Sequence, residues 1–261
     1  MRLTWLGHST VVLDLAGARV VADPLLRRRA GVLRVVRGPG TAGPEEWSRT
    51  APDAVVLSHL HHDHCDVPTL RAMRAAVVLA PVGAGRWLTG RGVEHVTELA
   101  VGQRHQVGGL VVTAVPADHG GRREPFGPTA AAVGHLVESP DLTVWLAGDT
   151  GTFAGMARIP AMAVRGVVDV AVVPVWGWGP RLGPGHLDPV RAAAAARTVG
   201  ARVAIPVHWG TLRMSGMARP MRTRLRMPGE WFLRALADAD DGGADAVRGV
   251  LLTPGEAVEL A

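Results

Sequence analysis

A short run of histidines and aspartates from His59 to Asp66 concentrates metal-binding side chains directly after an apolar stretch. From Ser58 the residues read Ser-His-Leu-His-His-Asp-His-Cys-Asp, and residues 54–57 before them are all apolar, as in a buried strand. Histidines two apart on the following turn can converge on one cation, while Asp63 and His64 can face a second. Buried polar side chains need partners, so a structural role alone would be costly. The alternative is a solvated loop that is rich in histidine.

Three other apolar runs also end close to a histidine or an aspartate. They are 111–115 before His119, 143–147 before Asp149, and 202–207 before His208. A single histidine after a strand is more often an ordinary surface residue. Three such residues, each just past an apolar run, favour a shared site instead.

The spacing His-x-His-x-Asp-His resembles the metal motif of the metallo-β-lactamase fold superfamily of hydrolases. Only one register fits, because the Asp-His pair can only be Asp63-His64, which leaves His62 as a spectator. The resemblance implies two metal sites that share one bridging carboxylate. It assigns His59, His61 and His119 to the first site, Asp63, His64 and His208 to the second, and Asp149 to the bridge.

Within that superfamily the chain is most similar to the branch of N-acyl-phosphatidylethanolamine-hydrolysing phospholipase D and ascorbate-6-phosphate lactonase. The blocks that carry this similarity span nearly the whole chain: 5–10, Asp23-Pro24, the run to Asp66, 147–150, 185–189 and 208–211. One departure follows His119, where the branch often shows a small residue, an arginine and an aromatic-rich strand. Here residues 120–126 lead to a strand without aromatics, which affects the expected substrate pocket rather than the metals.

The chain has 261 residues, a net charge of +5 and one cysteine, Cys65. A chain of this length can build one large core, so we expect a single domain over residues 1–261. One cysteine excludes an intramolecular disulfide and fits a reducing compartment. The first residues lead straight into a strand, and no apolar run approaches the ~20 residues of a membrane span. We therefore expect a cytoplasmic protein without a transmembrane segment.

All 28 basic residues are arginines, and two groups of them follow predicted strand ends, at 27–37 and 213–226. In the second group, arginines alternate with other residues over 221–227, so Arg222 and Arg224 share one face if the segment is extended. This pattern predicts either a rim that binds an anionic, partly apolar substrate or a charged edge strand. Both interpretations remain open. The residues expected to contact substrate are Arg122, Arg222, Arg224, Trp176 and Trp178.

The expected chemistry is metal-assisted hydrolysis. Two divalent cations about 3.5–4 Å apart can share a hydroxide of lowered pKa and polarise the bond that it attacks. Imidazole and carboxylate ligands favour Zn²⁺, with Mn²⁺ or Fe as alternatives. We expect Asp63 to accept a proton as well as bind metal, and His186, by resemblance, to stabilise an oxyanion or leaving group. Asp23 and His8 are expected to orient ligands by hydrogen bonding, although a strand-end aspartate can instead cap local backbone.

Together these features predict a binuclear metal-dependent hydrolase acting on a phosphodiester or another phosphate-bearing ester, since arginines offer paired donors to phosphate. A lactonase acting on a lactone, phosphorylated or not, is the alternative, because the same hydroxide can attack a carbonyl. A nucleic-acid-binding or nuclease-like protein is an alternative of another class, but the extra arm or inserted domain of such nucleases has no counterpart here. We expect a small anionic substrate and no nucleic-acid partner, and leave peripheral lipid contact and homo-oligomerisation open.

The remaining pattern indicates an α/β protein. Asp188 as N-cap, Pro189 at the first helical position and Gly200 after the end give the clearest helix, over 190–197. Other helices are expected at 67–75 and 230–239, and further strands at 3–6, 9–15, 19–22, 76–80 and 250–252. Strands gather at each end of the chain with helices between them, which fits two αβ halves. The family resemblance implies that these halves form a four-layer αββα sandwich.

Overall fold

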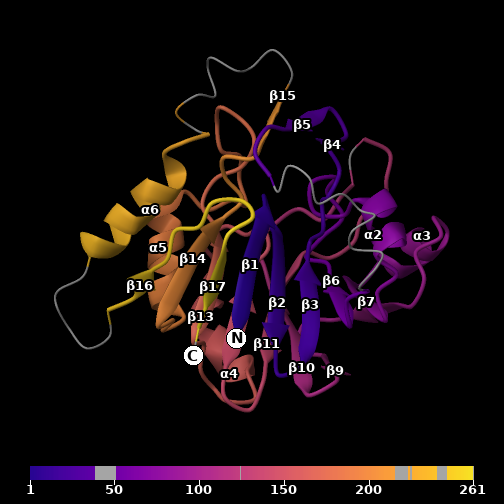
Figure 1. Ribbon diagram of the computed structural model, residues 1–261, viewed down its shortest axis with the longest axis horizontal. Coiled ribbons are helices and arrows are strands. Elements are labelled where there is room, and N and C mark those ends of the chain that lie inside the picture. The colour runs from indigo at the N-terminus through magenta and orange to yellow at the C-terminus, as the bar shows by residue number, and fades with distance from the viewer. Residues whose placement is uncertain (39–50, 124, 215–222, 224, 240–245, 261) are drawn as a thin grey trace.

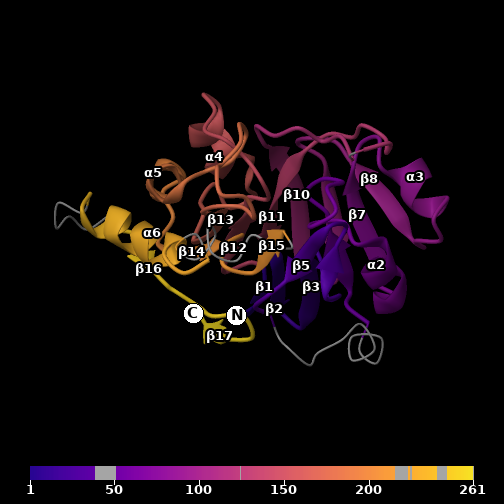
Figure 2. The same cartoon turned by 90° about the horizontal axis from the view of Figure 1, so that it is seen from above.

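The computed structural model describes residues 1–38, 51–123, 125–214, 223, 225–239 and 246–260. Within these ranges two seven-stranded sheets stack face to face, and helices cover their outer faces (Figures 1 and 2). This arrangement confirms the expected α/β class and the αββα sandwich.

The first sheet has the order β17-β1-β2-β3-β6-β7-β8. Its strands are β1 Arg2–Gly7, β2 Thr10–Leu15, β3 Ala18–Ala22, β6 Ala54–Val56, β7 Val77–Pro81, β8 Val96–Leu99 and β17 Ala257–Glu259. Strands β3, β6, β7 and β8 run parallel to one another. The two ends of the chain meet here, because β17 pairs antiparallel with β1 and the Met1 amino group donates to the Leu260 carbonyl at 2.7 Å.

The second sheet has the order β16-β14-β13-β12-β11-β10-β9. Its strands are β9 Arg104–Val107, β10 Leu110–Pro116, β11 Val133–Glu138, β12 Thr143–Leu146, β13 Val170–Pro174, β14 Val203–Val207 and β16 Arg248–Gly249. Strands β12, β13 and β14 are parallel. Parallel strands end at the same edge of a sheet, so the residues that follow β12 and β14 emerge on one side.

Helices flank both sheets, and a small third sheet lies at one end. The helices are α2 Val67–Met73, α3 Gly85–Thr89, α4 Ile159–Met162, α5 Pro189–Thr198 and α6 Pro228–Ala237, with a 3-10 turn, η1, at Met156–Arg158. Figure 2 shows α2 and α3 on the outer side of the first sheet and α5 and α6 on the outer side of the second. The third sheet, of order β15-β5-β4, comprises β4 Arg29–Ala30, β5 Leu33–Val35 and β15 Leu212–Met214.

Local sequence signals explain where two helices begin. Asp188 accepts a hydrogen bond from the Arg191 amide and Pro189 opens α5, as the N-cap pattern predicts. Asp66 caps α2 in the same way, from the end of the histidine-rich segment. The expected closing strand at 250–252 is wrong. Strand β16 ends at Gly249, and the chain closes with β17, which completes the first sheet instead.

Candidate metal centre

Four strand ends bring the predicted metal ligands together at one edge of the sandwich. The loop after β6 carries His59, His61, Asp63 and His64, while β10, β12 and β14 lead to His119, Asp149 and His208. The donor atoms of these residues form overlapping groups in which every pair lies within 4.8 Å. Side chains from opposite halves of the chain therefore converge on one spot.

The first group contains His59, His61 and His119. Nε2 of His59 lies 2.8 Å from Nδ1 of His61, which lies 3.2 Å from Nε2 of His119. His59 is fully buried, whereas His61 and His119 are half-buried. Three imidazole nitrogens thus face one point at the opening of the site.

The second group is deeper and contains Asp63, His64 and His208, joined by His8. Nε2 of His64 lies 3.0 Å from Nε2 of His208, and Oδ2 of Asp63 lies 3.8 Å from the same His208 nitrogen. Nε2 of His8 approaches Asp63 Oδ2 at 3.0 Å. All four side chains are buried.

Asp149 lies between the two groups. Its Oδ2 is 3.2 Å from Nε2 of His64 and 4.0 Å from Nε2 of His119, while its Oδ1 is 3.3 Å from Nε2 of His208. Among the described residues, this buried Oδ1 accepts no hydrogen bond. A buried carboxylate oxygen without a donor is costly unless a cation balances it.

Four of the predicted histidine ligands have their outer nitrogen held by an oxygen. Nδ1 of His64 donates to Asp23 at 2.8 Å, and Nδ1 of His208 and of His119 donate to the carbonyls of Trp176 and Gly185. Ser58 Oγ donates to Asp23 and therefore accepts from Nδ1 of His59. A histidine whose outer nitrogen carries the proton presents a lone pair from the inner one, which is the form that binds metal.

These donors fit divalent cations. Tetrahedral Zn²⁺ with Zn–N bonds of 2.0–2.1 Å places neighbouring ligand nitrogens about 3.3 Å apart, close to the 2.8–3.2 Å observed between the paired imidazoles. Lone pairs that face each other at such distances repel unless a positive charge lies between them. The donor set therefore suits metal better than it suits a hydrogen-bonded cluster.

The electrostatics also favour positive charge in the site. Burial alone would raise the pKa of Asp149, but His208 and His64 outweigh it and hold that pKa well below its ordinary value. Burial would lower the pKa of His64, yet Asp149 and Asp23 outweigh it and hold that pKa well above its ordinary value. Burial lowers the pKa of His59 well below its ordinary value, so this ring stays neutral. The carboxylates that raise the pKa of His64 would equally attract a cation in place of its proton, beside the neutral ring of His59.

Three non-glycine residues around the site adopt left-handed backbone conformations. They are His8 with φ 51°, Asp23 with φ 41° and His208 with φ 63°. Such conformations cost roughly 1–2 kcal/mol each and persist where neighbouring contacts impose them. Here the His208 amide donates to the His8 carbonyl at 2.9 Å, and Thr10 Oγ1 donates to the Asp23 carbonyl at 3.0 Å.

Comparison with known proteins gives the family. A sequence model described as a β-lactamase superfamily domain matches residues 18–209. A UPF0173 metal-dependent hydrolase of Methanopyrus kandleri is 30% identical over 99% of this chain and 100% of its own length. This chain belongs to the metallo-β-lactamase-fold, metal-dependent hydrolases.

Two other relatives of this chain are longer than the chain itself. An uncharacterized protein of Mycobacterium tuberculosis is 33% identical over 82% of this chain, which spans 60% of that protein's length. N-acyl-phosphatidylethanolamine-hydrolyzing phospholipase D 1 of Caenorhabditis elegans is 29% identical over 81% of this chain and 64% of its own length.

The solved structure of Igni18, a metallo hydrolase of Ignicoccus hospitalis, shares the fold at 22% identity and a TM-score of 0.74, with 98% and 97% of the two chains covered. Within the described ranges, no helix has the length and apolar character to cross a membrane.

The residues expected to support the predicted metal ligands lie beside them. Asp23 contacts His64, and His8 reaches Asp63 while its Nδ1 lies 3.1 Å from the Thr211 hydroxyl. His186 lies in the loop before α5, half-buried, with its Nε2 3.5 Å from Oδ2 of Asp149. Asp23, His8 and His186 are therefore each within reach of predicted metal ligands.

The expected substrate residues are placed less uniformly. The ring of Trp176 is buried in the core and its carbonyl accepts from Nδ1 of His208, whereas Trp178 is 38% exposed. Arg122 is exposed on the loop after His119. Arg222 and Arg224 lie outside the described residues, so the rim and edge interpretations of 221–227 both remain predictions.

Arg123, which the sequence pattern did not single out, supports the metal-binding loop from behind. Its buried guanidinium donates to the carbonyls of Leu60 at 2.6 Å and Cys65 at 2.9 Å, and to Nδ1 of His62 at 2.9 Å. The same group lies 4.8 Å from the ring centroid of Trp87. Nothing in the pattern separates Arg123 from Arg122; only the path of the loop turns one inward and the other outward.

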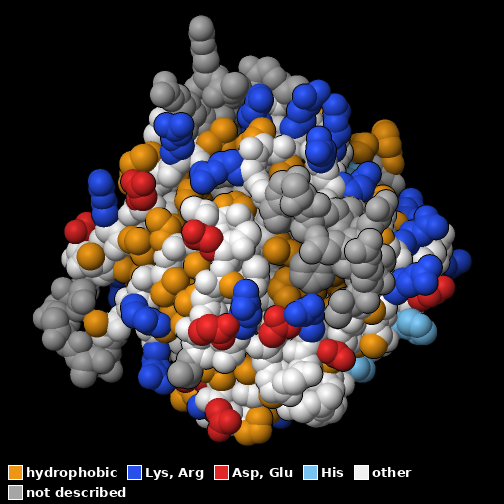
Figure 3. Space-filling model, viewed as in Figure 1, with side chains coloured by type: hydrophobic (Ala, Val, Ile, Leu, Met, Phe, Trp, Pro, Cys, Tyr) orange, Lys and Arg blue, Asp and Glu red, His pale blue; other side chains and the backbone are white. Residues whose placement is uncertain are grey.

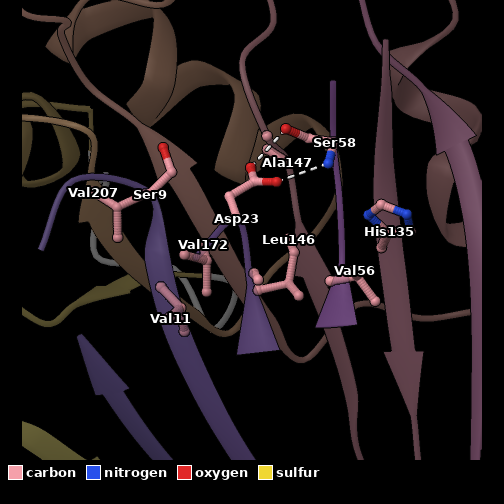
Figure 4. Close-up of a pocket in the computed structure, with 12 residues that line it drawn as sticks. Ser9, Val11, Asp23, Val56, Ser58, His135, Leu146, Ala147, Val172 and Val207 are labelled. Atoms are coloured by element: carbon pink, nitrogen blue, oxygen red, sulfur yellow. Dashed lines mark hydrogen bonds between the residues drawn. The ribbon is translucent and has the colours of Figure 1, made fainter. Parts of the chain in front are cut away.

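A small cavity of about 20 Å³ lies between the sheets beneath the metal centre (Figure 4). Figure 4 shows Asp23 held by Ser58 on one side of this space and His135 on the other. Burial lowers the pKa of His135 to about 4, and among the described residues its Nε2 has no hydrogen-bond partner. A neutral imidazole thus stands in the core directly behind the site.

Proposed function

We propose that the chain is a binuclear metal-dependent hydrolase that cleaves a phosphodiester or another phosphate-bearing ester. The observation that carries the proposal is the placement of Asp149 between two groups of imidazoles, with one buried oxygen free of any hydrogen-bond donor among the described residues. A carboxylate in that position can balance two cations at once.

His59, His61 and His119 would hold one cation, Asp63, His64 and His208 the other, and Asp149 would bridge. When bound, two divalent cations lower the pKa of a water molecule between them and polarise the oxygens of the bond that breaks. Zn²⁺ is the favoured metal because every donor is an imidazole nitrogen or a carboxylate oxygen, although Mn²⁺ and Fe bind such sets too.

The remaining chemistry falls to protein groups. Asp63 would take up the proton released as water attacks, at an oxygen that His8 orients from 3.0 Å. His186 would donate from Nε2 to the developing charge on the substrate in its protonated, imidazolium form, since its Nδ1–H already donates to the Pro184 carbonyl at 3.0 Å. Asp149 raises the pKa of His186 against the effect of burial, which keeps that proton available.

Two observations support a phosphate-bearing substrate. One is the similarity to the phospholipase D of C. elegans, whose name describes phosphodiester cleavage. The other is the group of exposed arginines gathered at the top of the molecule in Figure 3, whose planar guanidinium groups suit phosphate oxygens. A lactone could bind to the same metal ions, so lactone hydrolysis is the alternative activity that the experiment must distinguish.

The test begins with metal. Protein purified without added metal should contain one to two equivalents of transition metal by elemental analysis, and Asp149→Ala should lose part of it. Asp141→Ala, which removes an exposed carboxylate on the β11–β12 turn, is the control. Protein that carries no metal and takes up no added zinc would contradict the proposal.

Substrate class is tested with bis-p-nitrophenyl phosphate, simple lactones and phospholipids on the metal-loaded protein. If the protein hydrolyses lactones but not the phosphodiester, the proposed activity would be that of a lactonase and not of a phosphodiesterase. An electrophoretic shift with tRNA or single-stranded DNA that weakens steeply with salt would instead support the nucleic-acid class.

A further inference from the structure

Three arginines stand side by side across the small third sheet. In the register of this sheet Arg34 of β5 pairs with Arg29 of β4 on one side and with Arg213 of β15 on the other. Adjacent strands lie about 4.8 Å apart, so the three residues form a line across the sheet. We call Arg29, Arg34 and Arg213 the arginine row.

The third sheet has one apolar and one charged face. Ala30, Leu33 and Leu212 are buried and pack together with Leu25. Side chains alternate between faces along a strand, so the arginine row points to the opposite side. Arg29 and Arg34 are exposed and Arg213 is half-buried. Figure 3 shows basic side chains gathered at the top of the molecule, where Figure 1 places β4, β5 and β15.

Among the described residues, no carboxylate balances the charges of the arginine row. Within the described ranges no ion pair involves any of its three members, whereas nearby Arg27 is paired with Asp66 at 2.6 Å. Like charges directly opposite each other destabilise a sheet. Charged edge strands that prevent aggregation would explain Arg29 and Arg213, but Arg34 lies on the central strand, between the other two.

The arginine row is fixed beside the metal centre. A β-carbon at Gly31, in the turn between β4 and β5, would lie 3.7 Å from Cγ of His62, which follows the predicted ligand His61. At the other side of the sheet, Thr211 contacts His8 and its carbonyl accepts from the Val36 amide at 2.7 Å. The third sheet therefore lies next to the loop that carries His61 and, through Thr211, contacts His8.

We propose that the arginine row binds a second anionic group of the substrate, a phosphate that is distant from the bond being hydrolysed. The proposal rests on the proposed hydrolase function and narrows its substrate class. Metal ions would bind the ester group that is hydrolysed. The three aligned guanidinium groups of the arginine row offer paired N–H donors to a second phosphate elsewhere on the same substrate. Such a phosphate could belong to a soluble metabolite or to a lipid headgroup.

The first experiment compares two p-nitrophenyl phosphodiesters of glycerol, one with a free distal hydroxyl and one with a phosphate in its place. Wild-type protein should prefer the phosphorylated ester, and Arg29→Gln/Arg34→Gln should reduce that preference in kcat/KM roughly tenfold or more. Turnover of the hydroxyl ester and metal content should not change. Arg34→Lys should recover part of the preference, since it keeps the charge but not the fork.

The matched control is Arg158→Gln/Arg248→Gln, which removes the same charge from exposed positions. Arg248 pairs with Val203 at the start of β14, at the opposite end of that strand from His208. Arg158 precedes α4, which lies across the molecule from β15 in Figure 1. An equal loss in the control variant would mean a general effect of charge and would overturn the proposal.

Binding without turnover separates this proposal from the function itself. Calorimetric titration of the metal-loaded protein with glycerol 3-phosphate tests the soluble source. Sedimentation with vesicles of phosphatidylcholine and phosphatidylglycerol in equal parts, against phosphatidylcholine alone, tests the headgroup source. Weaker binding by Arg29→Gln/Arg34→Gln in either assay supports the arginine row even if neither ester is hydrolysed, in which case the proposed function fails alone. Unchanged binding in both assays would show that the row is only a charged face.

Discussion

Asp23, directly after β3, and His64, in the loop after β6, are joined by a 2.8 Å hydrogen bond from Nδ1 of the imidazole to Oδ2 of the carboxylate. The other oxygen of Asp23 accepts from the Ser58 amide at 2.7 Å. One side chain thus fixes the ring of a predicted ligand and the turn on which the metal-binding segment begins. Asp23 holds this position with a left-handed backbone, φ 41°.

Replacing Asp23 by asparagine should weaken metal binding without removing a predicted ligand. The amide keeps the size of the carboxylate but loses its charge, so it accepts more weakly from His64 and no longer favours the oriented tautomer. Loss of such a supporting group typically costs 10- to 100-fold in metal affinity. Competition with a chromophoric zinc chelator measures the change. Asp141→Asn, on an exposed turn, should bind zinc like wild type; an equal affinity for Asp23→Asn would argue that Asp23 only caps local backbone.

Gly148, directly before Asp149, should not tolerate alanine. A β-carbon there would lie 2.5 Å from Cβ of Ser58 and 3.1 Å from the Val133 carbonyl, and the residue has φ +62°. Positive φ alone costs an alanine about 1–2 kcal/mol, and the clash adds displacement of Ser58 and, through it, of Asp23. We expect a loss of at least about 2 kcal/mol in the free energy of unfolding and weaker zinc binding.

Gly166→Ala separates the cost of a positive φ from the cost of the clash with Ser58. Gly166 has a similar φ of +71°, but a β-carbon added there would meet no heavy atom within 4 Å. Denaturant unfolding of both variants should show the backbone cost in each and the additional loss only in Gly148→Ala. Equal losses would mean that contact with Ser58 contributes nothing.

The proximity of the predicted ligands could be anticipated from sequence because they follow short apolar runs, and the ends of strands in such sheets are where polar residues gather. His8 was expected near the ligands, but its contact with Asp63 depends on the turn between β1 and β2 and on the pairing of His208 with the His8 carbonyl. Such contacts are set by tertiary structure and not by local pattern.

Other features depended on register or on the course of a loop. The apolar residues 250–252 have the composition of a strand, yet β16 ends at Gly249. The last strand of the described chain is β17, which pairs with β1 in the first sheet. The arginine row exists only because three short strands align Arg29, Arg34 and Arg213, and the spacing of these residues along the chain does not reveal that alignment.

Arg123 should matter for stability and Arg122 for substrate. Removing the buried guanidinium by Arg123→Met would leave the carbonyls of Leu60 and Cys65 without donors, at about 1–3 kcal/mol for each buried group. We expect a lower free energy of unfolding and lower zinc affinity, with partial recovery in Arg123→Lys. Arg122→Gln, at the exposed neighbour, should leave unfolding unchanged and raise KM for an anionic ester. If Arg122→Gln lowered the free energy of unfolding more than Arg123→Met does, Arg122 would be the residue that stabilises the loop, and the assignment of the two arginines would be wrong.

His135 should make the folded protein sensitive to acid independently of metal. Burial lowers the pKa of His135 to about 4, from 6.5 for an exposed imidazole. Below pH 6.5, His135 is protonated in the unfolded chain but stays neutral in the folded one. The free energy of unfolding therefore falls as the pH decreases from 6.5 towards 4. The full difference corresponds to about 3 kcal/mol. His135→Leu should therefore lose this part of the acid sensitivity while remaining close to wild type at neutral pH, since its Nε2 has no partner among the described residues.

Unfolding of chelator-treated protein between pH 4 and 7 measures this effect, because metal loss then contributes equally to both proteins. His95→Asn is the control, since His95 is exposed and asparagine tolerates its left-handed φ of 53°. The difference in unfolding free energy between His135→Leu and wild type should grow steadily as the pH falls, and the control should show no such trend. Parallel pH curves for all three proteins would mean that His135 becomes protonated in the folded state as easily as in the unfolded one. The cavity beneath the metal centre would then be open enough to solvate an imidazolium, in conflict with the burial of His135 between the two sheets.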